Sequence, residues 1–142
     1  MAKYVKAVNK KASGIAVIFK DLVLLGKRSK TCYLTGDPVA FGGYWSIFGG
    51  IIEPNETEKQ AASREFFEET NISIDHNELK FIKKIRNDDC DFSIHAFFSN
   101  KMLFPNLNKE HTEYGWFKIS CLGMINGPID PKISKAIKKI KV

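Results

Sequence analysis

The sequence predicts one layered domain of the α/β or α+β class. First, the chain has 142 residues, a length typical of a single domain. Second, short apolar runs rich in β-formers lie on both sides of a segment with helix signals, and a second helical pattern lies near the end. Third, hydrophobic residues make up 44% and charged residues 27%, values that exclude wholesale disorder. Strands around helices favour packed layers of sheet and helix.

The strands are expected from local composition. Residues 14–19 and 22–25 are apolar and flank two polar residues, which indicates a hairpin. Residues 26–43 are rich in turn formers, and connections of this length are often functional. Four more strands are expected, at residues 44–48, 80–86, 92–99 and 114–119. The first of these should end at the glycine pair Gly49 and Gly50.

Two helices are expected. The first covers residues 57–70, because Thr57 and Gln60 form a capping box at its start and Asn71 tolerates the left-handed conformation that stops a helix. On a helical wheel, its packing face consists of Ala62, Ser63, Phe66, Phe67 and Thr70. The second helix covers residues 131–140, where a proline opens the helix and three isoleucines form one stripe.

The first helix carries an acidic face. Glu65, Glu68 and Glu69 fall within an arc of about 100°, although like charges at these spacings destabilise a helix. Arg64 borders the arc and can pair with Glu68. The chain has a net charge of +6, yet residues 53–69 hold six acidic and two basic side chains. Carboxylates that converge without a soft ligand suit Mg²⁺ or Mn²⁺; the alternative is a solvated acidic face.

Residues 50–72 match the pattern G-x5-E-x7-R-E-U-x-E-E-x-G-U, in which U is apolar, at every fixed position but one. The segment resembles the Nudix box, and the chain is identified as a small, MutT-like member of the Nudix family. Asn71 stands where the family has glycine, a mild change because both residues tolerate positive φ. Downstream, residues 110–116 resemble the E-H-x-x-x-x-W segment of several Nudix branches.

The resemblance implies an α/β/α sandwich with a mixed β-sheet and the box helix on one face, as a single Nudix domain over residues 1–142. It also implies an enzyme, a pyrophosphohydrolase that hydrolyses a diphosphate linkage in a nucleoside diphosphate derivative by attack of water on phosphorus. The implied cofactor is Mg²⁺ or Mn²⁺, which neutralises the diphosphate and lowers the pKa of a bound water.

The same resemblance assigns the metal site. Glu65 and Glu69 are the implied metal ligands, and Glu68 lies close behind them. A backbone carbonyl at Gly49 or Gly50 is expected to complete the ligand shell, because glycine lets the backbone approach closely.

Other roles are expected around this metal site. Arg64 is expected to orient a carboxylate, and Glu56 either supports Arg64 or binds metal through water. The general base stays open between Glu68, Glu110 and Glu113.

Two further residues are considered as contacts of the substrate, and one is considered as a catalytic group. Arg28, near the end of the hairpin, is expected to touch phosphate. Trp45 is the candidate to stack on a base, with a position in the core or at the rim of the site as the alternative. His111 fits an exposed surface histidine better than a catalytic one.

The substrate stays open. Dinucleoside polyphosphates and other nucleotide diphosphates are favoured, and nucleoside triphosphates come next. One alternative is an RNA 5′-end pyrophosphohydrolase, which the excess of lysine keeps open. Another is a non-catalytic Nudix-fold module that binds a nucleotide. The family resemblance leaves open whether the protein is a monomer or a homodimer.

The cellular location of the protein is predicted from the lack of membrane-span and disulfide patterns in the sequence. Its longest apolar runs are far below the ~18 residues of a membrane span. Its three cysteines form no CxxC pair and predict no disulfide framework. We therefore expect a cytoplasmic protein without a membrane partner.

Overall fold

The computed structural model describes residues 10–142. The strands are β1 (Lys10–Phe19), β2 (Leu22–Arg28), β3 (Trp45–Ser46), β4 (Phe48–Ile51), β5 (Lys80–Arg86), β6 (Cys90–Phe98) and β7 (His111–Lys118). The α-helices are α1 (Glu58–Thr70) and α2 (Pro131–Lys138), and short 3-10 helices occupy His76–Glu78 and Ile119–Met124. None of the helices described between residues 10 and 142 is long and apolar enough to cross a membrane.

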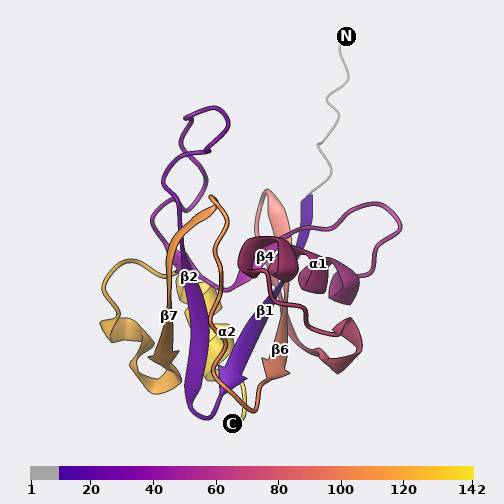
Figure 1. The fold of residues 1–142 in the computed structure, drawn as a ribbon, viewed down its shortest axis with the longest axis vertical. Helices are drawn as coiled ribbons and strands as arrows, with labels where there is room; N and C mark the ends of the chain where they lie inside the picture. The colour runs from indigo at the N-terminus through magenta and orange to yellow at the C-terminus, as the bar shows by residue number, and fades with distance from the viewer. Residues whose placement is uncertain (1–9) are drawn as a thin grey trace.

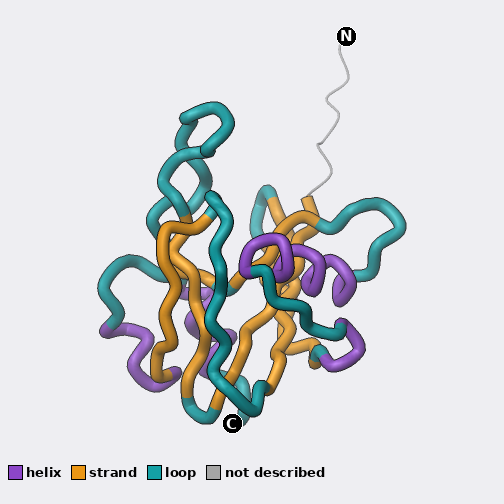
Figure 2. Tube along the Cα trace, in the orientation of Figure 1, coloured by secondary structure: helices purple, strands orange, loops and turns teal. Residues whose placement is uncertain are grey.

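All seven strands form one mixed sheet, whose arrangement is drawn in Figures 1 and 2. Its main path runs β3-β2-β1-β6-β5, while β4 pairs with β1 and β7 pairs with β2. Strand β1 runs parallel to β6 and antiparallel to β2 and β4, so the predicted mixed sheet is confirmed. The predicted hairpin is β1–β2, in which Phe19 pairs with Leu22.

The central strand β1 is buried on both faces. Ile15 and Val17 belong to the apolar cluster that includes Phe66 of α1. Ala16 and Ile18, which alternate with them, belong to the cluster that includes Ile137 of α2. Helix α1 therefore packs on one face of the sheet and α2 on the other, as Figure 1 shows. The predicted α/β/α sandwich is confirmed, with the box helix on one face.

The glycine pair lies inside a strand rather than at the end of one. Gly49 and Gly50 belong to β4, where they pair with Gly14 and Ser13 of β1. A Cβ atom on Gly49 would overlap the Ser13 backbone, so this close pairing needs glycine. The expected strand over residues 44–48 is instead split into β3 and β4.

Helix α1 begins and ends as predicted, but it buries a different face. Both hydrogen bonds of the Thr57 capping box form, and Asn71 adopts a left-handed conformation with φ 60°. The predicted packing position Phe67 is 46% exposed, whereas Glu69 is only 2% exposed. The helix is therefore rotated so that Glu69, rather than Phe67, points into the fold.

Candidate active site

Three carboxylates converge at the C-terminal half of α1. Glu65 and Glu69 lie one turn apart on α1, and Glu110 directly precedes β7. One carboxylate oxygen of each lies within 4.8 Å of those of the other two. The segment before β7 is attached to the helix end, because the Asn108 N–H donates to the Glu69 carbonyl at 3.2 Å. The Asn108 side chain in turn accepts a hydrogen bond from the Glu110 N–H at 3.0 Å.

The electrostatics of this cluster favour a bound cation. Burial, together with the contacts of Glu69 with Glu110 and Glu65, raises the pKa of Glu69 to about 10, against a smaller opposing contribution from the Gly49 backbone. Burial also raises the pKa of Glu65, which Arg64 opposes. The Oε1 atom of Glu69 is buried and has no hydrogen-bond partner among residues 10–142. A divalent cation would neutralise these charges and give that oxygen a partner, so the donor set fits a hard metal ion.

Strand β4 contacts the cluster through a glycine. A Cβ atom at Gly50 would overlap the carboxyl group of Glu65. Glycine therefore lets the β4 backbone lie against this carboxylate without a shift of the Glu65 side chain. The structure thus brings together Gly50, Glu65 and Glu69, three of the residues that the resemblance assigns to the metal site.

Arg64 holds the acidic residues around it in place. Its Nε donates to Glu56 Oε2 at 2.7 Å, and its Nη2 donates to Glu56 Oε1 at 3.0 Å. Its Nη1 donates to Glu65 at 3.0 Å, and Nη2 also donates to the Ile51 carbonyl at 3.0 Å. These hydrogen bonds lower the pKa of Glu56 and raise that of Arg64. These hydrogen bonds agree with the first of the two roles expected for Glu56, support of Arg64.

Two acidic candidates lie outside the cluster. The Glu68 side chain is 52% exposed, and its carboxylate accepts hydrogen bonds of 3.3 Å from Arg64. The Glu113 side chain is 57% exposed, and its carboxylate lies 4.0 Å from Nζ of Lys27. The structure therefore brings Glu110, and not Glu113, to the carboxylates of α1.

A cavity of about 1050 Å³ opens beside the three carboxylates. Arg28 lines it, and the Arg28 Nε is buried without a hydrogen-bond partner in the described part of the chain. Trp45 does not line it. Trp45 is 4% exposed, belongs to the core on the α2 side of the sheet, and donates from Nε1 to the Asn126 carbonyl at 2.8 Å. The prediction that Trp45 stacks on a base is therefore corrected.

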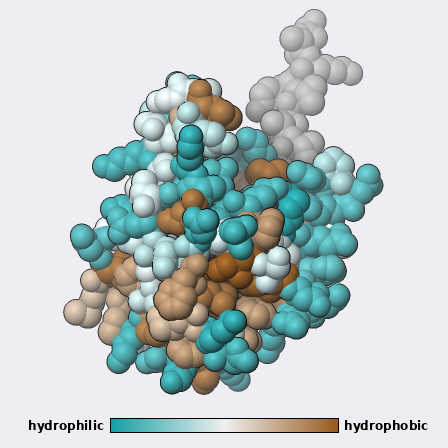
Figure 3. Space-filling view, viewed as in Figure 1, coloured by the Kyte–Doolittle hydropathy of each residue, from teal (hydrophilic) through white to brown (hydrophobic). Residues whose placement is uncertain are grey.

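The sequence interpretation missed two groups of residues at this site. His111 is 6% exposed rather than on the surface, and its Nδ1 lies 3.5 Å from Glu69 Oε2. Tyr33, Phe41 and Tyr44 line the cavity from the segment between β2 and β3. This segment projects from the fold, with an apolar area at its end (Figures 2 and 3). The length of this connection indicates a functional segment, but it does not identify which side chains line the cavity.

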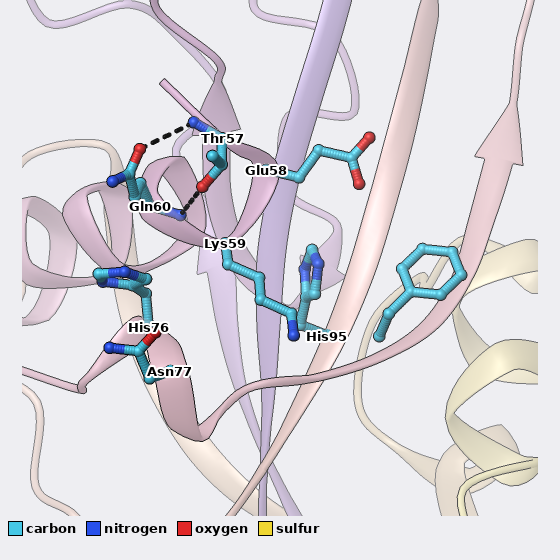
Figure 4. A pocket seen from close by; sticks show the side chains of 8 residues that line it. Thr57, Glu58, Lys59, Gln60, His76, Asn77 and His95 are labelled. Carbon is cyan, nitrogen blue, oxygen red and sulfur yellow. Dashed lines mark hydrogen bonds between the residues drawn. The ribbon is translucent and has the colours of Figure 1, made fainter. Parts of the chain in front are cut away.

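A second cavity of about 490 Å³ lies at the other end of α1 (Figure 4). Its lining includes Thr57 and Gln60, whose hydrogen bonds already cap this helix end. His95, also in the lining, is 1% exposed and lies within hydrogen-bond distance of the Ser13 hydroxyl, at 3.2 Å. The three clustered carboxylates are not in its lining, so this cavity is separate from the candidate active site.

The fold of the chain is similar to that of several solved structures. No curated protein sequence matches the chain. A MutT NUDIX hydrolase from Burkholderia pseudomallei superimposes with a TM-score of 0.73 at 17% identity, over 95% of this chain and 100% of the other. An Ap4A hydrolase from C. elegans gives 0.62 at 18% identity, over 90% and 93%. The dihydroneopterin triphosphate pyrophosphohydrolase of E. coli gives 0.66 at 20% identity, over 94% and 97%.

These structural likenesses show a shared fold. The sequence itself matches the family model for the NUDIX domain over residues 9–139, nearly the whole chain. That match confirms the family predicted from the box and supports the expected enzyme class, a pyrophosphohydrolase. The chain therefore belongs to the NUDIX domain family.

Proposed function

We propose that the protein is a divalent-metal-dependent pyrophosphohydrolase that cleaves the diphosphate linkage of a nucleoside diphosphate derivative. The observation that carries this proposal is the convergence of Glu65, Glu69 and Glu110 within 4.8 Å of one another beside a cavity of about 1050 Å³. Binding sites for small molecules typically have volumes of roughly 300–1,000 Å³. The cavity is therefore large enough for a nucleotide.

The residues of the cluster have complementary roles in this proposal. Glu65, Glu69 and Glu110 would hold Mg²⁺ or Mn²⁺, with the backbone carbonyl of Gly50 as a further oxygen ligand. When bound, such an ion supplies the positive charge that neutralises diphosphate oxygens and makes water more acidic. Arg64, which donates to Glu65 at 3.0 Å, holds this carboxylate in position.

Substrate contacts and proton transfer fall to other residues. Arg28 lines the cavity with an unpartnered Nε, which suits a phosphate oxygen of the substrate. Two carboxylates remain candidates for the base that takes a proton from the attacking water. Glu110 lies in the cluster, whereas Glu68 lies beside Arg64 at the exposed edge of α1.

The substrates to be tested follow from the site and from its structural neighbours. Two of these neighbours are named for reactions on Ap4A and on dihydroneopterin triphosphate. This supports dinucleoside polyphosphates as the first class and triphosphates as the second. RNA with a 5′-triphosphate is a third class, because the chain carries a net charge of +6.

A substrate panel tests the proposal. The full chain is incubated in Mg²⁺ or Mn²⁺ with Ap4A, nucleotide sugars, nucleoside triphosphates and 5′-triphosphate RNA. Both products of each reaction are identified by mass spectrometry. We expect hydrolysis that EDTA abolishes and that Glu113→Gln, a change outside the cluster, leaves intact. Binding of nucleotides without hydrolysis in either metal would instead indicate a non-catalytic binding module.

A further inference from the structure

The segment between β2 and β3, residues 29–44, presents aromatic side chains to the cavity. Tyr33, Phe41 and Tyr44 all line the cavity that Glu65 and Glu69 also line. Tyr33 is 56% exposed and Phe41 is 53% exposed. Large aromatic rings that stay exposed beside a binding cavity leave apolar surface available to a ligand.

The position of Phe41 is defined by its backbone and by a neighbouring ring. Phe41 has φ 56°, a left-handed conformation that is unusual for a bulky residue and is associated with functional sites. Its ring packs edge-to-face on Tyr44, with the ring centres 5.3 Å apart. The Tyr44 N–H also donates to the Phe41 carbonyl at 3.0 Å. The two rings therefore form one packed unit on the cavity wall.

Tyr33 is linked to the segment that carries Glu110. The Lys109 ammonium group lies 5.8 Å from the centre of the Tyr33 ring. Ser29, at the start of the aromatic segment, donates from its N–H to the Glu110 carbonyl and from its hydroxyl to the Lys109 carbonyl, both at 2.9 Å. The aromatic segment and the carboxylate cluster are therefore connected by direct contacts rather than by a shared cavity alone.

We propose that Tyr33 and Phe41, supported by Tyr44, form a stacking surface for the nucleobase of the substrate. This inference rests on the proposed function and extends it to the part of the substrate that is not cleaved. Arg28 ends β2 directly before the aromatic segment, so phosphates that contact Arg28 would leave the base beside these rings. Stacking uses the face that every base has and grows with ring area. We therefore expect tolerance of base identity, with purines binding more tightly than pyrimidines.

Binding of monophosphates separates this inference from hydrolysis. Affinities of the full chain for AMP, CMP and ribose 5-phosphate are measured by calorimetry with Mg²⁺ present. None of these ligands contains a diphosphate linkage, and ribose 5-phosphate lacks only the base. Stacking of one base on an aromatic residue, measured by alanine substitution of that residue, changes affinity roughly five- to 150-fold. We therefore expect AMP to bind at least about tenfold more tightly than ribose 5-phosphate. CMP should fall between them.

Substitutions then assign the effect to the aromatic residues. Tyr33→Leu and Phe41→Leu should each weaken AMP binding about tenfold and leave ribose 5-phosphate binding unchanged. Phe41→Tyr, which keeps a ring, should retain AMP affinity. The matched control is Phe104→Leu, because Phe104 is 74% exposed but does not line the cavity. Thermal melting verifies that each variant is folded.

The outcomes separate the two proposals. If Tyr33→Leu and Phe41→Leu leave both AMP affinity and the KM for every hydrolysed substrate unchanged, the stacking surface is refuted while the hydrolase stands. If the wild type hydrolyses nothing but these variants lose AMP affinity selectively, the stacking surface stands and the hydrolase fails. An equal loss of AMP affinity in Phe104→Leu would also overturn the assignment to the cavity.

Discussion

The Nδ1 atom of His111 lies 3.5 Å from Oε2 of Glu69, and both side chains are 3% exposed. Burial, with a contribution from the charge of Arg28, lowers the pKa of His111 to about 4. Burial, with contributions from Glu110 and Glu65, raises the pKa of Glu69 to about 10 when no metal is bound. At neutral pH both groups are therefore uncharged in the metal-free protein, and the contact is not an ion pair. A metal ion that binds Glu69 must displace its proton.

The stability of the metal-free protein should fall as pH rises above about 6.5. Between the usual pKa of 4.5 and about 10, folded Glu69 holds a proton that the unfolded chain has lost. The free energy of unfolding then decreases with pH, by at most about 1.4 kcal/mol per pH unit. Between pH 6.5 and about 4, the unfolded chain protonates His111 and the folded chain does not, so this group lowers stability as pH falls.

Urea denaturation from pH 5 to 9 in EDTA measures this profile. Below pH 6.5 the effect of His111 opposes that of Glu69, and above pH 6.5 the decline caused by Glu69 should dominate. Saturating Mg²⁺ should remove the alkaline decline, as should Glu69→Gln in EDTA. Profiles with and without Mg²⁺ that superimpose would count against a metal site at Glu69.

Glu69→Gln should reduce turnover more than about a hundredfold, because loss of an outer-shell partner alone typically costs 10–100-fold. The variant keeps the shape of the side chain but removes the charge that the metal ion needs. Its metal-free form should melt at the same temperature as the wild type or higher, because glutamine is uncharged at every pH, whereas Glu69 must keep a proton to be uncharged. Hydrolysis rates and melting curves in EDTA test both expectations. Wild-type hydrolysis by the variant would refute the ligand assignment.

Gly50→Ala should weaken metal binding. The new methyl group would occupy the space of the Glu65 carboxylate, which must then shift from its present place in the cluster with Glu69 and Glu110. We expect at least about a tenfold loss of Mn²⁺ affinity, measured by electron paramagnetic resonance of the free ion. Gly123→Ala is the matched control, because a Cβ atom at Gly123 has no heavy atom within 4 Å. Equal affinities for Mn²⁺ in both variants would contradict this prediction.

Arg64→Lys should not behave as a conservative change. Lysine cannot bond both oxygens of Glu56 and also reach Glu65 and the Ile51 carbonyl. We expect a loss of about 2 kcal/mol of unfolding free energy and weaker Mn²⁺ binding. Urea denaturation in EDTA and the resonance titration measure these effects. Arg86→Lys serves as the control, because the Arg86 side chain is 74% exposed and surface pairs contribute little.

Asn71→Val should destabilise the protein by about 1–2 kcal/mol, because a β-branched residue is strained in the left-handed conformation at this position. Asn71→Gly should be close to neutral. Glycine relieves the backbone but adds freedom to the unfolded chain, at a cost of about 0.4–1 kcal/mol. Both variants are compared with the wild type by urea denaturation and by hydrolysis rate. A valine variant as stable and active as the wild type would show that the position does not require positive φ.

Local patterns were sufficient to predict the elements whose signals lie close together in the chain. Thr57 and Gln60 define the start of α1, and Asn71 its end, through contacts within a few residues. The glycine pair was misinterpreted because its partners, Ser13 and Gly14, lie more than thirty residues away. Whether a glycine ends a strand or permits close pairing depends on that distant partner.

Distance along the chain also decided which parts of the site could be predicted. Glu65 and Glu69 could be placed together because they lie one helical turn apart, whereas Glu110 reaches them through Asn108 and the end of α1. The burial of Trp45 and His111 depends on which face of the sheet each one meets. The face is set by pairing between strands that are distant in the chain, such as β2 and β7, in which Arg28 pairs with His111.

The position of β1 between β4 and β6 has a consequence for how the chain folds. Residues 12–15 pair with β4 on one side and with β6 on the other, and Ser13 contacts His95 across 82 residues of sequence. A strand synthesised first thus lacks its parallel partner until residue 98 has left the ribosome. Such distant pairings slow the folding of small domains. Nascent chains that end before β6 should be cleaved readily by proteases. In chains that include β6, strands β1 and β6 should become resistant to proteases at the same time.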